Sequence, residues 1–198
     1  MKRIFSLFLV LAALTAALLV FPACGDKPDT STHRVAIEVQ DFGTIELELY
    51  PNKAPITVAN FEKLVKEGFY DGLTFHRIVK DFMIQGGDPK GDGSGGSDKT
   101  IKGEFSQNGF TRNDIKHERG VISMARSSSS NDSASSQFFI MHGDAPYLDG
   151  SYAAFGRVTS GMDVVDAIAN VKVKGNGSGE TSTPAKPVVI TRMYMIED

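Results

Sequence analysis

FHRIVKDFMIQGGD, residues Phe75 to Asp88, is the most informative stretch of the chain. A second informative stretch lies further along, SSQFFIMHGDAPYLDGSYAAFGRV, residues Ser135 to Val158. Together they place arginine, glutamine and bulky apolar side chains on short predicted strands, with no nucleophile, metal cluster or phosphate loop beside them.

The flanking sequence predicts a mainly β domain with two helices. Apolar and polar residues alternate over 35–39 and over 45–49, which predicts two half-buried antiparallel strands. Apolar residues repeat with helical spacing after Pro55 and again over 162–170, and Gly68 stands where a helix C-terminus favours glycine. Further strands are expected near residues 73–79, 82–86, 121–125, 136–142, 153–158 and 188–196.

About eight short strands with glycine-rich turns favour a closed barrel or a sandwich. The 198 residues suffice for one domain with a substantial core and are too few for two ordinary domains. Lys172–Lys186, rich in Gly, Ser, Thr and Lys, is expected to be a surface loop before the last strand. The serine-rich segment Ser127–Ser136 is interpreted either as an extended groove rim or as a flexible loop.

The first 32 residues do not fit the pattern of the domain. Lys2 and Arg3 precede an uncharged, largely apolar run of 18 residues, Ile4 to Phe21, which is typical of an export signal. The only cysteine, Cys24, follows this run and precedes the polar stretch Gly25 to Thr32. We therefore expect a signal peptide over 1–23, a tether over 24–32 and a folded domain over 33–198.

The surroundings of Cys24 resemble a bacterial lipoprotein signal, which implies that this cysteine becomes the lipid-modified first residue of the mature protein. Phe21 and Pro22 depart from the usual residues of that signal, and the apolar run is close to the minimum length of a membrane-spanning helix. The alternatives, in order, are a lipid anchor on Cys24, an uncleaved helical anchor and full release. We expect an exported protein of the cell envelope, a membrane-anchored lipoprotein facing the periplasm or the exterior.

Charge and motifs exclude several classes of function. Without Lys2 and Arg3 the chain carries 19 basic and 24 acidic residues, which does not favour nucleic acid as a partner. Gly91–Gly96 matches G-x-G-x-x-G, but the helix that a dinucleotide site needs is not predicted after it. The four histidines have no paired metal-ligand spacing. No cofactor, metal or nucleic acid is expected.

The two quoted stretches resemble the signature of the cyclophilin family of peptidyl-prolyl cis/trans isomerases. The resemblance runs from about His33 to the C-terminus, and it is specific because two separated motifs occur in the family's order. It implies a closed eight-stranded antiparallel barrel capped by two α-helices. It also implies an enzyme that accelerates rotation about peptide bonds preceding proline.

The resemblance assigns catalytic positions to Arg77, Phe82 and Gln85. A guanidinium keeps its charge and offers several donors in a fixed plane, although an arbitrary arginine is more often a surface residue in an ion pair. For Arg126 the match is through the backbone, because the family commonly has asparagine there. The positions implied to bind substrate are Met83, Gly93, Ala125, Arg126, Ser127, Gln137, Phe139, Tyr147, Leu148 and Tyr152.

Two positions bear on ligand choice. Tyr147 stands where well-known eukaryotic members have tryptophan, and Tyr152 stands where they have histidine. We expect isomerase activity to be retained. Cyclosporin binding should be weak, because the indole N–H of the tryptophan is lost.

Two functions remain open at this point. The first is a prolyl isomerase that assists the folding of exported or envelope proteins, with proline-containing polypeptides as its partners. The alternative is a non-catalytic chaperone or scaffold that binds proline peptides in the same groove. Arg77 favours the enzyme, since a pure binder has less need of that charge. A monomer is expected in either case.

Overall fold

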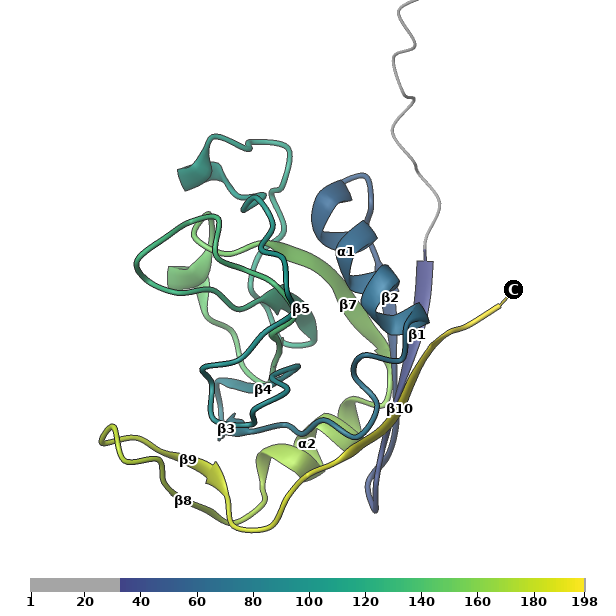
Figure 1. The fold of residues 1–198 in the computed structure, drawn as a ribbon, viewed down its shortest axis with the longest axis vertical. Helices are drawn as coiled ribbons and strands as arrows, with labels where there is room; N and C mark the ends of the chain where they lie inside the picture. Colours follow the sequence, from purple (N-terminus) through teal and green to yellow (C-terminus); the bar gives the residue numbers. More distant parts are fainter. Residues whose placement is uncertain (1–32, 198) are drawn as a thin grey trace, which may run out of the picture.

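The computed structural model describes residues 33–197, so the expected signal peptide, the tether and Cys24 lie outside the described residues. Figure 1 shows a curled sheet with helices packed against it and one hairpin projecting from it. The strands of the main sheet are β1 (His33–Val39), β2 (Gly43–Leu49), β3 (Arg77–Val79), β4 (Met83–Gly86), β5 (Val121–Met124), β6 (Phe138–Met141), β7 (Ala154–Ser160) and β10 (Ile190–Met195). The helices are α1 (Pro55–Lys66) and α2 (Met162–Ala169), with short 3-10 turns at Ser106–Asn108 and Pro146–Leu148.

The main sheet has eight strands in the order β10-β1-β2-β7-β5-β6-β4-β3, and the pairs in its ladders are antiparallel. A mainly β fold of eight strands with two helices is therefore confirmed. The prediction of a closed barrel is an overstatement, because β3 and β10 form the two edges of a curled sheet. These edges meet near an isolated bridge between Thr74 and Val189. Strand β3 has only three residues, and it pairs with β4 but forms no continuous ladder with β10.

Strand alternation divides the side chains of β4 and β6 between the two faces of the sheet. Ile84, Phe138 and Ile140 point into the main core, where each is fully buried. Met83 and Phe139 belong to a second, separate apolar cluster on the other face. The second cluster is therefore a property of the strand register, and it forms the floor of the site described below.

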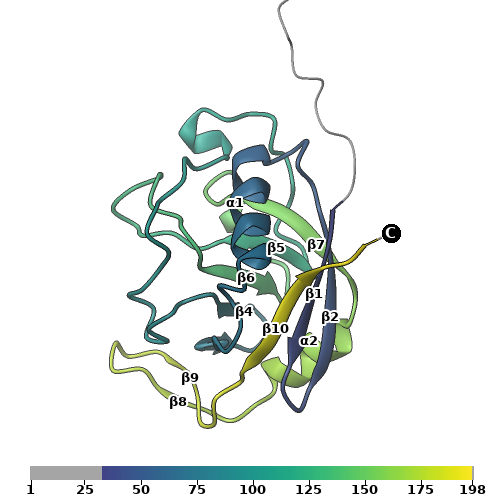
Figure 2. The ribbon, with the colours of Figure 1, turned by 45° about the vertical axis from the view of Figure 1, so that its right-hand side comes forward.

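The two helices lie towards opposite ends of the curled sheet in both ribbon views (Figures 1 and 2). Helix α1 ends with Glu67 as C-cap and is followed by Gly68 at φ +67°, so the predicted helix end is confirmed. Helix α2 covers nearly the whole of the predicted segment and buries Val164, Val165 and Ile168. Within residues 33–197, no helix combines the length and apolar character that a membrane span requires.

The N-terminus of α1 is capped by a residue distant in sequence. The N-cap residue, Ala54, has no side chain that could accept the free N–H groups of the first turn. Glu104 does so instead: its carboxylate accepts the backbone N–H groups of Ile56 (3.0 Å) and Thr57 (2.8 Å) and the Thr57 hydroxyl (2.8 Å). A negative charge at a helix N-terminus is favourable, and Glu104 is 1 % exposed.

The segment Lys172–Lys186 differs from its prediction as a surface loop. It contains a hairpin of β8 (Val173–Gly175) and β9 (Thr181–Pro184), with β9 packed beside β3. Figures 1 and 2 show this hairpin projecting from the edge of the sheet. Its two strands are short, and the residues that β9 buries include the polar Ser182, so hydrophobic periodicity could not reveal the hairpin.

Replacing the buried carboxylate of Glu104 should destabilise the domain. Glu104→Ala leaves helix N–H groups and a buried hydroxyl without their acceptor, and we expect a loss of about 2–4 kcal/mol in the free energy of unfolding. Urea unfolding measures this, with the exposed Glu118→Ala as control. Equal losses in the two variants would show that Glu104 is not a significant cap.

Candidate active site

The outward face of β4 and β6 borders a cavity of about 160 Å³, called here the Phe139 cavity. Its lining residues are Arg77, Phe82, Met83, Gln85, Ala125, Arg126, Phe139, Leu148 and Tyr152. Phe139 and Leu148 are almost fully buried, and Phe82 and Tyr152 are packed against them at the edge of the same cluster. The cavity thus offers aromatic and aliphatic walls, with the permanent charges of Arg77 and Arg126 beside them.

The register of three adjacent strands places the central side chains in one row. Arg77 of β3 lies opposite Gln85 of β4, and Gln85 lies opposite Phe139 of β6. Cross-strand partners share a face of the sheet. The row therefore puts a cation, an amide and an aromatic ring side by side on the wall of the Phe139 cavity.

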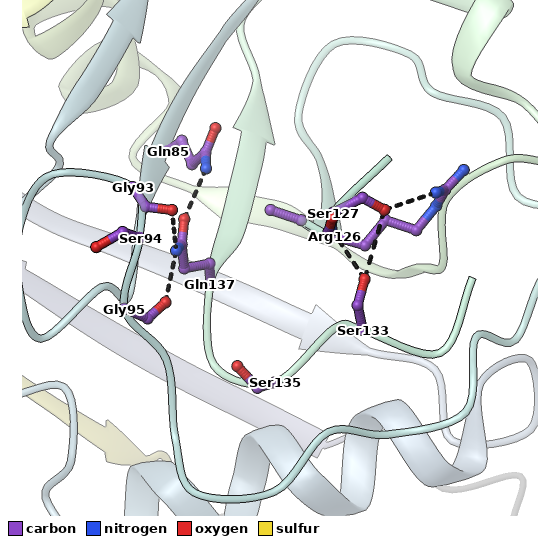
Figure 3. A pocket seen from close by; sticks show the side chains of 10 residues that line it. Gln85, Gly93, Ser94, Gly95, Arg126, Ser127, Ser133, Ser135 and Gln137 are labelled. Carbon is purple, nitrogen blue, oxygen red and sulfur yellow. Dashed lines mark hydrogen bonds between the residues drawn. The ribbon is translucent and has the colours of Figure 1, made fainter. Parts of the chain in front are cut away.

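A chain of hydrogen bonds runs from Arg77 to the loop of residues 91–96, called here the glycine-rich loop. Arg77 Nη1 donates to Gln85 Oε1 (3.2 Å), and Gln85 Nε2 donates to Gln137 Oε1 (2.8 Å). Gln137 Nε2 in turn donates to the carbonyls of Gly93 (3.0 Å) and Gly95 (2.7 Å), as Figure 3 shows. The two amides are thereby fixed in orientation, and they link the arginine to the backbone of the loop.

A second cavity of about 240 Å³, called here the Gln137 cavity, adjoins the first and shares Gln85, Ala125 and Arg126 with it. Figure 3 shows it between the glycine-rich loop on one side and Ser127 and Ser133 on the other. Its lining is mostly polar or backbone, in contrast to the Phe139 cavity. The pair of cavities forms a groove suited to an extended peptide with one apolar ring.

Asp88, the last residue of the first quoted stretch, holds the glycine-rich loop in place. This buried carboxylate accepts the N–H groups of Lys90 (2.8 Å), Asp92 (3.2 Å) and Gly93 (2.6 Å). A Cβ atom on Gly95 would lie 2.1 Å from Asp88 Oδ1, so glycine is required there. Sequence reasoning missed Asp88, although an acid directly before a glycine-rich stretch is a signal for such a turn.

The serine-rich segment is part of the groove rim. Ser133 and Ser135 line the Gln137 cavity, and Ser127 N–H donates to Ser133 Oγ (2.9 Å). Ser136 is fully buried, and its hydroxyl donates to the carbonyl of Gly87 (2.7 Å). Of the two interpretations of this segment, the structure favours the rim.

The guanidinium of Arg77 is held on a second side by a carboxylate from the β8–β9 hairpin. Nε and Nη2 donate to the two carboxylate oxygens of Glu180, each at 2.7 Å. These hydrogen bonds lower the pKa of Glu180 to about 2, so the carboxylate is ionised at neutral pH. Arg77 is thus both a residue of the cavity wall and a member of an ion pair. Sequence reasoning missed Glu180 because its segment was predicted to be a loop.

Behind the Phe139 ring lies a buried imidazole. His117 stacks on Phe139 with ring centroids 6.1 Å apart, and its Nε2 is 3.0 Å from Ser123 Oγ while its Nδ1 is 3.1 Å from Asp149 Oδ1. The order Ser–His–Asp is that of a hydrolytic triad, but Ser123 is fully buried and no substrate can reach it. The cluster therefore supports the cavity wall and offers no nucleophile.

All but one of the predicted catalytic and substrate-binding residues line one of the two cavities. The exception is Tyr147, which is 70 % exposed and packs its ring against Phe82 at 6.0 Å between centroids. The Arg126 guanidinium lies over the Tyr152 ring (4.9 Å) and donates to the carbonyls of Ser151 and Ser127, so its side chain also shapes the groove. The individual roles of these residues stay predictions.

No cluster of three or more His, Cys, Asp or Glu side chains suited to a metal ion occurs between residues 33 and 197. The groove is lined by the guanidinium groups of Arg77 and Arg126, neutral amides, hydroxyls, backbone groups and apolar walls. Such a set can hold an apolar ring and donate hydrogen bonds to the peptide beside it.

Comparison with known proteins gives the family. Residues 34–195 match the family model for "Cyclophilin type peptidyl-prolyl cis-trans isomerase/CLD". The chain is 48% identical over 143 residues to peptidyl-prolyl cis-trans isomerase B of Bacillus subtilis (strain 168), covering 69% of this chain and 95% of that protein. It is 38% identical over 202 residues to peptidyl-prolyl cis-trans isomerase A of Dickeya dadantii (strain 3937), covering 99% and 98%.

Solved structures agree. A Cryptosporidium parvum cyclophilin type isomerase superimposes with a TM-score of 0.74 at 27% identity, over 85% of this chain and 99% of that one. A structure of the same protein in the presence of the dipeptide Ala-Pro gives a TM-score of 0.73 at 28% identity, over 83% and 99%. The chain belongs to the cyclophilin type peptidyl-prolyl cis-trans isomerase family. The predicted family, fold and enzyme class are confirmed.

Burial of His117 should make the stability of the domain depend on pH near neutrality. Burial lowers the pKa of this imidazole below its ordinary value of 6.5, against the opposing effect of Asp149, and burial likewise lowers the pKa of His76. Below pH 6.5 the unfolded chain then binds more protons than the folded one. The free energy of unfolding should therefore fall as pH decreases from 6.5 towards the lowered pKa values.

Urea unfolding at several pH values between about 7.5 and 5.5 measures this slope, in a range where most carboxylates do not titrate. His117→Gln removes one of the two imidazoles whose pKa is lowered and should give a shallower slope, whatever its effect on absolute stability. An unchanged slope in this variant would contradict the assignment of a neutral buried imidazole.

Proposed function

We propose that the protein accelerates cis/trans rotation about X-Pro bonds of exported or envelope polypeptides, with Arg77 as the principal catalytic residue. The observation that carries the proposal is the row Arg77–Gln85–Phe139, which sets a permanent cation beside an apolar cavity. A similar structure obtained in the presence of the dipeptide Ala-Pro supports a proline-containing ligand for this groove.

The reaction is a rotation about the C–N bond and requires no covalent step. Resonance gives the peptide C–N bond a rotation barrier of about 18–20 kcal/mol, and uncatalysed X-Pro isomerisation takes tens to hundreds of seconds. In the twisted state the prolyl nitrogen regains its lone pair and can accept a hydrogen bond. We infer that Phe82, Met83, Phe139 and Leu148 hold the pyrrolidine ring, which contributes about 1–2 kcal/mol of binding.

Arg77 acts on the twisted amide in this scheme. An N–H of the guanidinium donates to the prolyl nitrogen or to an adjacent carbonyl, and the charge makes that hydrogen bond stronger in a partly desolvated cavity. Gln85 and Gln137 fix the position of the guanidinium relative to the backbone of the glycine-rich loop. Gln85 therefore acts chiefly by orienting Arg77. The Gln137 cavity receives the peptide on the side of Gly93 and Ser127.

Removal of the guanidinium tests the proposal against a binding-only role. Arg77→Ala should lower the isomerisation rate of a chromogenic proline tetrapeptide by one or more decades, each about 1.4 kcal/mol, in a protease-coupled assay. Glu180, being partly exposed, is solvated after the change, so the fold should persist. The exposed Arg192→Ala on β10 is the matched control.

Equal rates for wild type and Arg77→Ala would instead favour the non-catalytic chaperone or scaffold. In the catalytic scheme no group that titrates near neutrality contacts the substrate, so turnover of the wild type should be nearly flat between about pH 6 and 8. Weak cyclosporin binding and a monomeric state belong to the same proposal.

The envelope location rests on the sequence of residues 1–32. A basic start, an uncharged apolar run and Cys24 at its end support an exported lipoprotein whose domain is tethered to a membrane surface. In this arrangement the isomerase works on polypeptides as they emerge from export.

Mass analysis of the mature N-terminus tests the location. We expect a protein that begins at Cys24 and carries two or three acyl chains. An intact Met1 would indicate the uncleaved helical anchor, and an unmodified N-terminus near Cys24 would indicate a released protein; either result would contradict the lipid anchor.

A further inference from the structure

The guanidinium of Arg77 is gripped from two directions. Its Nε and Nη2 form a bidentate pair with the Glu180 carboxylate, at 2.7 Å for each bond. Its Nη1 donates to Gln85 at 3.2 Å and lies 3.6 Å from the sulfur of Met83. Two parallel N–H···O bonds fix both the position and the plane of the guanidinium, which a single bond does not.

The hairpin that carries Glu180 is organised to present it. Asn176 Oδ1 accepts the N–H groups of Ser178 (2.9 Å) and Glu180 (3.2 Å), and the Asn176 N–H donates to the Glu180 carbonyl (2.9 Å). Gly177 and Gly179 supply the positive φ angles, +80° and +90°, that this tight tip requires. The carboxylate is therefore held by a local turn, and the packing of β9 beside β3 brings that turn to Arg77.

A second set of contacts anchors the same turn to the buried side of β9. Asn176 Nδ2 donates to Ser182 Oγ at 3.3 Å, and Ser182 is 1 % exposed. The hydroxyl of Ser182 also stabilises the ionised form of Glu180, adding to the effect of Arg77 on its pKa. A pair between two unconstrained surface side chains lacks this kind of support and usually contributes little.

We propose that Glu180 is a positioning residue for prolyl isomerisation: it engages the Nε edge of Arg77 and so leaves the remaining N–H groups of the guanidinium available to the twisted peptide bond in the Phe139 cavity. The inference rests on the proposed catalytic role of Arg77. Among the described residues, the Nε edge of Arg77 bonds Glu180 alone, and the opposite side bonds Gln85.

The physical benefit is preorganisation. An arginine side chain has several rotatable bonds, and immobilising it only in the transition state would cost free energy at that moment. Glu180 and Gln85 immobilise it beforehand, so the hydrogen bond to the prolyl nitrogen forms without that cost. The Glu180 carboxylate also neutralises part of the Arg77 charge, which weakens the electrostatic stabilisation of the transition state. We predict that the gain in rate from fixing the guanidinium is larger than this loss.

Kinetics of hairpin variants test the inference. Glu180→Gln introduces an amide donor against a guanidinium donor, and we expect kcat to fall about tenfold with KM changed less than about twofold. Glu180→Asp keeps the charge and should retain more activity than Glu180→Gln. Lys174→Ala, exposed on β8 in the same hairpin, is the matched control and should equal wild type.

A double-mutant cycle separates positioning from a structural role of the hairpin. If Glu180 acts through Arg77, Glu180→Gln should have no further effect in the Arg77→Ala background. A further loss of rate there would show that the hairpin supports the site in another way, and the inference would fail. A wild-type rate for Glu180→Gln alone would also overturn the inference. A faster rate would overturn it as well, because it would show that the ion pair with Glu180 lowers the activity of Arg77. An inactive wild type, in contrast, would overturn the proposed function itself.

Discussion

The site depends on the register of three neighbouring strands. In β3, β4 and β6, the outward-facing residues include Arg77, Gln85 and Phe139, which are successive cross-strand partners. Between them on each strand lie residues such as Ile84 and Ile140 that fill the main core. Since a slip of one residue would exchange the two faces, the core and the site enforce the same register. Burial of the inner face therefore fixes the geometry of the outer one.

Around this row, loops from distant parts of the chain supply what the strands lack. The glycine-rich loop is held by Asp88 and offers its carbonyls to Gln137, and the β8–β9 hairpin offers Glu180 to Arg77. Behind the wall, His117 stacks on Phe139. Buried or charge-assisted hydrogen bonds fix both loops where they meet the row of Arg77, Gln85 and Phe139.

Much of this could be predicted from the sequence, and the limits have physical reasons. Hydrophobic periodicity located the strands of the main sheet and both helices because their buried faces repeat along the chain, and the motif around Arg77 identified the cavity wall. The β8–β9 hairpin was missed because its strands are only three and four residues long and show no apolar alternation. Glu104 and Glu180 were missed because each binds groups far away in the sequence that only the fold brings near. Asp88 was missed although its partners are local, two to five residues further along the chain. The incomplete seam between β3 and β10 depends on a ladder only three residues long.

The central claim is that an apolar cavity holds a proline ring while Arg77 hydrogen-bonds the adjoining peptide. A crystal structure of the protein with a bound Ala-Pro peptide tests it most directly. The account predicts the pyrrolidine ring against Phe139, Met83 and Leu148, with an Arg77 N–H directed at the prolyl nitrogen or a neighbouring carbonyl. A proline ring bound elsewhere on the domain, or an Arg77 that contacts only Glu180 and Gln85 in the complex, would contradict it.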